Sequence, residues 1–286
     1  MYFNYNKDIE YAKLVLGLND SSFSELINVS RMTLNRWKNN KSIPNYETLD
    51  NLYNIFYDKN VYLNRIKEEM YNSNVSKNHC ILFHGAKTEI IGNPSIKYSE
   101  DKKDFGKGFY LGETFNQSAS FITGYDKSSV YIFDFNLKNL KIKEFDVSEE
   151  WMLIITYYRG KLQEFSNSNY IKRLIDELKD IDVIIAPIAD NQMYTTLDDF
   201  ISGKITNLQC INALSANRLG KQYVFFNDKV INNNLKMLER CFYCKNERND
   251  YYNYRLKENE IGKNKVKIAL REYAGKGKYI EELLNE

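Results

Sequence analysis

Three short segments carry the side chains best suited to chemistry. Residues 83–85 read Phe-His-Gly at the end of an apolar run, residues 105–111 read Phe-Gly-Lys-Gly-Phe-Tyr-Leu, and residues 118–121 read Ser-Ala-Ser-Phe. Two glycines around a lysine are, by themselves, a weak indication of a phosphate-binding loop. The combination is more specific, because histidine, tyrosine and serine can hydrogen-bond a polar ligand while aromatic rings pack against its flat faces.

Together these segments resemble the nicotinamide pocket of the ADP-ribosyltransferases, and in particular the catalytic domains of the poly(ADP-ribose) polymerase type, whose signature is a His-Tyr-Glu triad. From about residue 80 to residue 226 the chain looks more like a bacterial family with the same transferase core. Residues 186–190 and 219–225 extend the likeness. The resemblance implies that NAD is the substrate and that it binds an α+β domain with a split β-sheet core.

The resemblance also implies a role for each matching residue. His84 would bond a ribose hydroxyl of NAD, and the backbone N–H and C=O of Gly85 would bind the carboxamide. Tyr110 and Phe121 would flank the nicotinamide ring, and the hydroxyl of Ser118 would bond the carboxamide oxygen. A structural alternative stays open for each side chain: a histidine at a strand end, two aromatic core residues, and an ordinary helical serine.

Gln222 stands where the triad of the resembled family has glutamate. Cleavage of the bond between ribose and nicotinamide depends on positioning and on electrostatic stabilisation of an oxocarbenium-like state. Glutamine can bond a ribose hydroxyl, but it brings no negative charge and cannot act as a general base, so polymer formation is not expected. Mono-ADP-ribosylation, slow NAD hydrolysis and NAD binding without turnover remain open, and Glu113 or Asp190 is a candidate for a substitute carboxylate.

The elements before these segments read as a separate helical domain over residues 1–72. Ser30 is placed to cap a helix whose Leu34 and Trp37 face inward, and Pro44 precedes the next helix. This stretch resembles the helix-turn-helix of phage-repressor-like proteins, which implies nucleic-acid contacts by the outward-facing residues Arg31, Met32, Asn35, Arg36 and Lys38. Because acids and bases roughly cancel across residues 1–70, packing on a partner protein or on the rest of the chain remains an alternative.

The remainder forms a second expected domain, residues 79–286. It holds four β-like runs (79–83, 130–135, 183–186, 223–226), several helical patterns (115–123, 149–159, 170–179, 194–202, 207–217) and a helical tail over 235–284 that breaks at Gly262 and at 275–277. Strands and helices without a regular βαβ alternation indicate an α+β fold.

Composition narrows the function class. The chain has 286 residues and a formal charge of +2, which gives no general attraction to nucleic acid or membranes. We find neither an apolar run near the roughly 20 residues of a membrane span nor a signal pattern, so we expect a cytoplasmic protein without a membrane partner. Cys241 and Cys244 have zinc-ligand spacing but no second pair, so reduced thiols are expected and no metal.

These observations predict an NAD-dependent mono-ADP-ribosyltransferase, which is a glycosyltransferase, acting on a protein or nucleic-acid acceptor. The pairing of domains suits a bacterial toxin or defence effector whose small domain binds DNA or an antitoxin partner. The alternative is a DNA-binding regulator that senses NAD without catalysis, which the glutamine at position 222 favours.

Overall fold

The computed structural model describes residues 3–189, 191–216 and 220–284. Within these residues helices and strands follow one another irregularly, and both parallel and antiparallel strand pairs occur. The expected α+β class is therefore confirmed. The chain divides into two compact units: the first comprises Met1–Gly92, Thr114–Asn136 and Lys236–Tyr254, and the second comprises Asn93–Glu113, Leu137–Leu235 and Arg255–Glu286.

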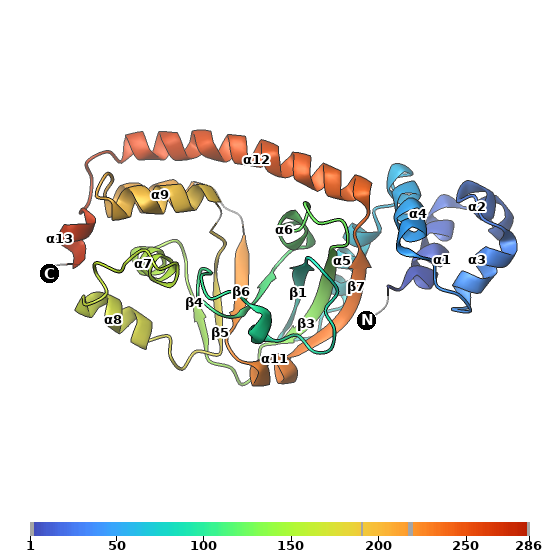
Figure 1. The fold of residues 1–286 in the computed structure, drawn as a ribbon, viewed down its shortest axis with the longest axis horizontal. Coiled ribbons are helices and arrows are strands. Elements are labelled where there is room, and N and C mark those ends of the chain that lie inside the picture. Colours follow the sequence, from blue (N-terminus) through green and yellow to red (C-terminus); the bar gives the residue numbers. More distant parts are fainter. Residues whose placement is uncertain (1–2, 190, 217–219, 285–286) are drawn as a thin grey trace. The chain divides into compact units, whose positions relative to one another are not determined.

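The first unit combines five N-terminal helices with three strands and a short helix (Figure 1). Its elements are α1 (Tyr5–Leu16), α2 (Asp20–Leu26), α3 (Arg31–Lys38), α4 (Tyr46–Asp58), α5 (Leu63–Ser73), β1 (His79–Ala86), α6 (Phe115–Ser120), β3 (Ser129–Asn136), nearly all of β7 (Leu235–Phe242) and the first residues of α12 (Lys245–Glu272).

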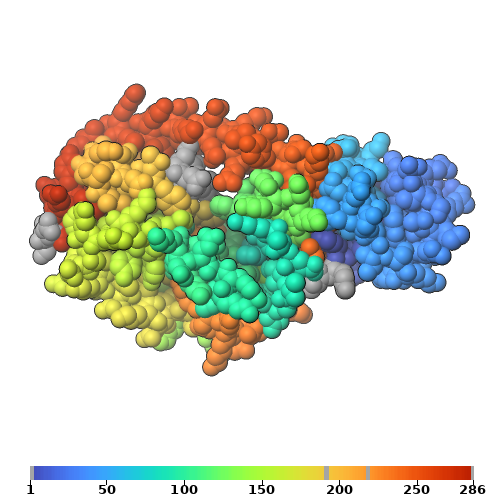
Figure 2. Space-filling view, in the orientation of Figure 1, coloured from blue at the N-terminus to red at the C-terminus, as the bar shows by residue number. Residues whose placement is uncertain are grey.

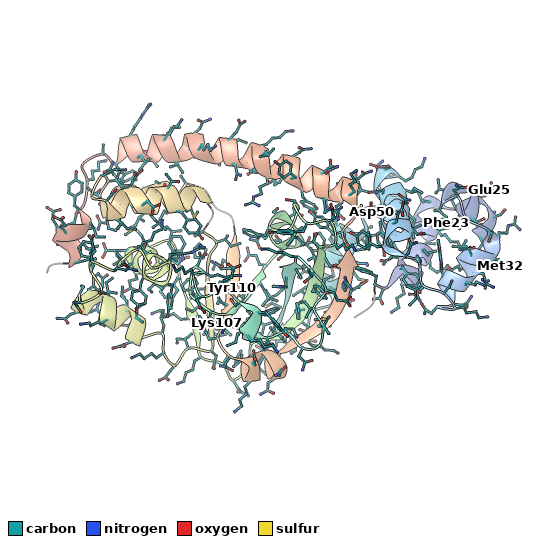
Figure 3. The ribbon with its side chains drawn as sticks, viewed as in Figure 1. Phe23, Glu25, Met32, Asp50, Lys107 and Tyr110 are labelled. Atoms are coloured by element: carbon teal, nitrogen blue, oxygen red, sulfur yellow. The ribbon has the colours of Figure 1, made fainter. Side chains whose placement is uncertain are left out.

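The expected helix after Ser30 is confirmed, and so are the faces of its residues except that of Lys38. The side chain of Ser30 accepts a hydrogen bond from the backbone N–H of Thr33 and so caps α3. Leu34 and Trp37 are buried, whereas the other side of the helix is exposed, including Met32, which is 66% exposed (Figure 3). The spacing of the apolar residues therefore predicted which side of α3 packs inward.

The N-terminal helices pack around Phe242 at the end of β7. Its ring lies 5.0 Å from that of Phe3, 5.2 Å from that of Tyr46 and 4.7 Å from that of Tyr53. Phe242 thus belongs to the same buried cluster as the cores of α1 to α4. The expected division near residues 72–79 falls inside this unit, and the helices pack on the chain itself, as one of the alternatives proposed.

The strands of the first unit form an antiparallel ladder beside α6. His79 pairs with Asn136 at one end of β1 and Ala86 pairs with Ser129 at the other, and β7 is the other neighbour of β3. Side chains alternate between the faces of a strand. The face of β1 that carries Ile81 and Phe83 packs against Phe115 of α6.

The second unit contains the remaining strands and most of the later helices. Its elements are η1 (Ile96–Tyr98), β2 (Phe109–Gly112), β4 (Ile142–Glu144), α7 (Glu149–Tyr158), α8 (Asn169–Asp176), β5 (Val183–Pro187), α9 (Asn191–Ile201), α10 (Asn207–Ser215), β6 (Lys221–Phe225), α11 (Asp228–Asn234), the later part of α12, and α13 (Ile280–Leu284). The residues around η1, drawn in teal, lie at the surface (Figure 2).

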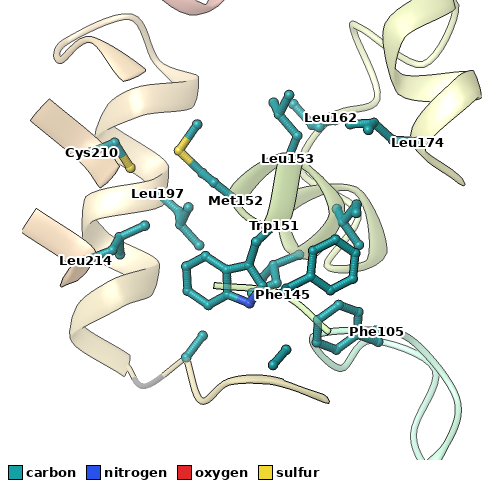
Figure 4. Close-up of a cluster of buried hydrophobic side chains, with 14 of the residues drawn as sticks. Phe105, Phe145, Trp151, Met152, Leu153, Leu162, Leu174, Leu197, Cys210 and Leu214 are labelled. Carbon is teal, nitrogen blue, oxygen red and sulfur yellow. The ribbon is translucent and has the colours of Figure 1, made fainter. Parts of the chain in front are cut away.

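A large apolar core holds this second unit together. The strand order is β4, β5, β6, β2, with β4 parallel to β5 and the other two pairs antiparallel. Figure 4 shows Trp151 of α7 at the centre of the cluster, with Phe105 and Phe145 on one side and Leu197 of α9 on another. Burial of large side chains of this kind contributes roughly 1.5–3 kcal/mol each.

The C-terminal tail differs from the expectation in two ways. Residues 235–242 form strand β7 and not a helix, because Glu239 to Phe242 are buried in the first unit. Gly262 does not break α12, since one interior glycine costs a helix only about 1 kcal/mol. Gly275, with φ +69°, does follow its end, as expected. Among the described residues, no helix is both long and apolar enough to cross a membrane.

The first unit contains a buried carboxyl, Glu247, that makes stability depend on pH. Glu247 accepts a hydrogen bond of 2.7 Å from the side-chain amide of Asn64, and burial raises its pKa from 4.5 to about 8. The folded protein therefore binds a proton more tightly than the unfolded chain between those two values. The unfolding free energy contributed by this group falls as the pH rises through this window.

We expect Glu247→Gln to remove this pH dependence, because the amide keeps the shape but cannot ionise. At pH 8 and above the variant should be more stable than the wild type by at least ~1 kcal/mol, and the difference should shrink toward pH 5. Chemical denaturation from pH 5 to 9 measures this. The exposed Glu69→Gln of α5 is the control, and parallel curves for all three proteins would contradict the prediction.

Candidate functional site

The residues that the sequence proposes for binding NAD fall in both units. His84, Gly85, Ser118 and Phe121 belong to the first, and Tyr110 and Gln222 belong to the second. In the first unit they belong to β1 and to α6 with its C-cap, and in the second they belong to β2 and β6.

In the first unit, Gly85 lets α6 approach β1 closely. Thr114 and Gln117 form a capping box that starts α6. A Cβ built on Gly85 would lie 2.2 Å from the backbone oxygen of Ser118, so no other residue fits there without a shift. The hydroxyl of Ser118, itself buried, donates a 2.8 Å hydrogen bond to the carbonyl of Phe83. Gly85 and Ser118 are therefore brought together.

His84 and Phe121 lie differently. His84 is half-buried and pairs with Tyr131 in the β1–β3 ladder. By strand alternation its side chain lies on the face of β1 opposite to the one that α6 covers. Phe121 is the C-cap residue of α6 and is 51% exposed, so it is not the core residue that its spacing allowed.

In the second unit, Tyr110 and Gln222 come from paired strands. The β2–β6 register places Tyr110 opposite Val224 and Gly112 opposite Gln222. Opposite residues share a face, and so do residues two apart along a strand, so Tyr110 and Gln222 project from the same face. Gln222 is 7% exposed. The sequence separates these two residues by more than a hundred positions, and the strand pairing brings them together.

The phenol of Tyr110 closes the tight turn that precedes β2. Its hydroxyl accepts from the backbone N–H of Phe105 at 3.1 Å and donates to the carbonyl of Gly106 at 2.7 Å. Burial raises the pKa of Tyr110, so the phenol stays protonated at neutral pH. These two hydrogen bonds fix the orientation of the ring, and the proton of the hydroxyl is already donated to Gly106.

The glycines of residues 105–111 serve packing. Gly106 has φ +71°, and a Cβ there would lie 2.8 Å from the ring of Tyr158. A Cβ on Gly108 would lie 2.7 Å from the side chain of Val224. Lys107 between them is exposed (Figure 3). The two glycines are thus explained by the fold of the turn, without a bound phosphate.

Sequence reasoning missed the polar residue at the centre of this region, Asp104. Its carboxylate is 5% exposed and accepts hydrogen bonds from Arg159 (2.6 and 3.2 Å), from the hydroxyl of Tyr194 (2.6 Å) and from the side-chain amide of Gln222 (2.8 Å). The guanidinium of Arg159 also lies 4.1 Å from the centre of the Tyr194 ring. The run Glu-Asp-Lys-Lys-Asp at 100–104 gave no signal, since it reads as a solvated charged loop.

The amide nitrogen of Gln222 has a second acceptor, the carbonyl of Pro187, at 3.1 Å. Of the two substitute carboxylates considered from sequence, Glu113 is partly buried directly after β2, and Asp190 lies outside the described residues. The carboxylate beside Gln222 is therefore that of Asp104, which no motif or spacing in the sequence indicated.

The basic residues of α3 are not all exposed as expected. Arg31 and Arg36 are exposed, as are Met32 and Asn35. Lys38, which was expected to face outward, is half-buried because its ammonium lies 2.8 Å from the carboxylates of both Glu10 and Asp20. Its charge is thus offset within the first unit.

The cysteines do not assemble a metal site. Cys241 and Cys244 are fully buried, and burial raises the pKa of both thiols. Across the described ranges of the chain, no group of three or more His, Cys, Asp or Glu side chains is arranged to hold a metal ion.

Comparison with known proteins identifies a family. Residues 80–237 match the model of the family described as "Protein of unknown function (DUF3990)", and because this is more than half of the chain, the protein belongs to that family. The matched region contains every residue proposed above for NAD, whereas α1 to α5 lie outside it. No curated protein and no solved structure gives a significant match to the chain.

The close approach of α6 to β1 predicts the effect of a single methyl group. Gly85→Ala places a Cβ 2.2 Å from a backbone oxygen, so α6 must move and the stability should fall by roughly 1–3 kcal/mol. Thermal denaturation measures the loss. Gly124→Ala is the matched control, because that position has open space and no positive φ; equal stability of the two variants would contradict the prediction.

Proposed function

We propose that the protein is an NAD-dependent mono-ADP-ribosyltransferase that modifies a protein or nucleic-acid acceptor. The observation that carries the proposal is the pairing of β2 with β6, which places Tyr110 and Gln222 on one face of neighbouring strands. These are the positions at which the resembled transferases have the tyrosine and the glutamate of their triad. The contact of Gly85 with Ser118 in the first unit supports it further.

In the proposed reaction a nucleophilic oxygen or nitrogen of the acceptor attacks C1′ of the nicotinamide ribose. The bond from C1′ to the nicotinamide nitrogen breaks, and its electron pair returns to the ring, which leaves neutral; the acceptor loses its proton to solvent. Positive charge develops on the ribose, so positioning and electrostatics supply most of the catalysis.

The proposed roles follow the resemblance. As the resemblance implies, the rings of Tyr110 and Phe121 would each pack on the nicotinamide, and such contacts with a cationic ring contribute on the order of 1 kcal/mol. The hydroxyl of Ser118 would turn from the carbonyl of Phe83 to bond the carboxamide oxygen, the backbone of Gly85 would bind the carboxamide, and His84 would bind a ribose hydroxyl. The glutamine at position 222 cannot deprotonate an acceptor, which favours single transfer to an acceptor that is already nucleophilic.

A second candidate function is a DNA-binding regulator that senses NAD without turnover. Two observations favour it: the amide of Gln222 is neutral and already donates to Asp104, and α3 presents Arg31 and Arg36 to solvent. In either case the N-terminal helices α1 to α5 would bind DNA or a protein such as an antitoxin, which suits a toxin or defence effector.

The first test is whether the purified protein consumes NAD and labels an acceptor. We expect His84→Ala and Tyr110→Ala each to abolish labelling, because one removes a ribose contact and the other a ring contact. Mass spectrometry of cell extract incubated with the protein and isotope-labelled NAD detects both the activity and the acceptor class. The exposed Tyr252→Ala is the control, and undiminished labelling by both site variants would refute the site.

The second test separates the two candidate functions through Gln222→Glu. The new carboxyl would meet the carboxylate of Asp104 at the present 2.8 Å contact, so like-charge repulsion raises the pKa of the pair. Turnover should therefore rise with pH as the second proton leaves, by up to about 10²-fold over the wild type. A large rise with NAD affinity retained identifies the native protein as a sensor or weak enzyme. Unchanged turnover at every pH would show that the charge at position 222 does not matter.

A further inference from the structure

The carboxylate of Asp104 is held in a fixed orientation by groups from three elements. One of its oxygens accepts from Arg159 at the end of α7 and from the hydroxyl of Tyr194 in α9. The other oxygen accepts from Gln222 of β6. The carboxylate of Asp104, which is 5% exposed, stays beside Arg159 because leaving the arginine would strip a buried charge of its compensation.

This arrangement decides which end of the Gln222 amide faces inward. Both groups that it contacts, the carboxylate of Asp104 and the carbonyl of Pro187, accept hydrogen bonds and cannot donate them. The amide nitrogen must therefore point at them, and the amide oxygen is the atom turned away from them. A carboxylate that accepts from an amide N–H also polarises that amide and strengthens its oxygen as an acceptor.

We propose that Asp104 is a positioning residue that makes Gln222 present its amide oxygen, and not its nitrogen, to the ribose of NAD. This inference rests on the function proposed above. An acceptor oxygen can take a hydrogen bond from a ribose hydroxyl, as the glutamate of the resembled triad would. It also places partial negative charge, fixed in advance, beside the ribose on which positive charge develops.

Asp104→Asn tests the inference, because it keeps the shape of the side chain and removes the carboxylate that orients the Gln222 amide. Arg159 and Tyr194 both donate to one oxygen of Asp104, so the asparagine must turn its oxygen toward them and its NH₂ group toward Gln222. Two donors would then face each other while the carbonyl of Pro187 still accepts only from the Gln222 nitrogen, so the amide no longer has one orientation that satisfies both neighbours and its oxygen is no longer held toward the ribose. We expect kcat for NAD consumption to fall by about 10²-fold with little change in KM.

The double variant Asp104→Asn/Gln222→Glu restores a matched donor and acceptor with the roles exchanged. It should recover at least tenfold of the lost kcat at neutral pH, and exceed Gln222→Glu alone, in which two carboxylates compete. Glu149→Gln is the matched control in the same unit: Glu149 also accepts two side-chain hydrogen bonds, from Tyr170 and Asn207, and shares no partner with Gln222. It should leave kcat and KM unchanged.

Calorimetric titration with NAD distinguishes a failure of the proposed function from a failure of this inference alone. A wild type that neither binds nor consumes NAD overturns the proposed function and this inference with it. A wild type that turns over NAD while Asp104→Asn keeps its kcat, or loses no more than Glu149→Gln, overturns the inference alone. A wild type that binds NAD without turnover also overturns the inference, because its effect is expected on kcat and not on the affinity for NAD. If Asp104→Asn does not fold, the double variant decides, and equality with Gln222→Glu overturns the inference.

Discussion

The second unit depends on one buried charge, the carboxylate of Asp104. Its position fixes the turn before β2, because the next residues, Phe105 and Gly106, are the ones that hydrogen-bond the phenol of Tyr110. The same carboxylate ties that turn to Arg159 and to the amide of Gln222. Withdrawing a buried carboxylate from water costs several kcal/mol unless such partners are in place, so the turn, the helix end and the strand must form together.

The identity of residue 222 follows from the same constraint. A glutamate there would put a second carboxylate within hydrogen-bond distance of Asp104, with Arg159 as the one guanidinium among the contacts described for that carboxylate. Coupled carboxylates of this kind share a proton, so one of them would be neutral at moderate pH. Glutamine leaves Asp104 as the one carboxylate of this contact, with no second acid coupled to it. The glutamine at position 222 is thus matched to its neighbour Asp104, whose carboxylate accepts a hydrogen bond from its amide.

The sequence predicted what depends on local pattern. The cap at Ser30 and the inward spacing of Trp37 located α3, and the apolar run from Val183 located β5. It could not predict Asp104, whose charged neighbours in the sequence resemble a solvated loop, while its partners lie 55, 90 and 118 positions away. Nor could it predict β7, since a strand rich in charged residues is recognisable only once Glu239 has found its buried partner.

A second buried network, in the first unit, shows why a buried carboxylate alone does not indicate a site. Lys67 lies 2.7 Å from both Asp8 and Glu239, and the phenols of Tyr53 and Tyr71 donate to those two carboxylates. Each of these donors ends on a carboxylate, so the network ties α1, α5 and β7 together and offers no oriented group to a ligand. An amide donor is not sufficient either, since Glu149 and Glu247 also accept hydrogen bonds from side-chain amides. Under the proposed function Asp104 differs because the amide that donates to it belongs to Gln222, which projects from the same face of the β2–β6 pair as Tyr110.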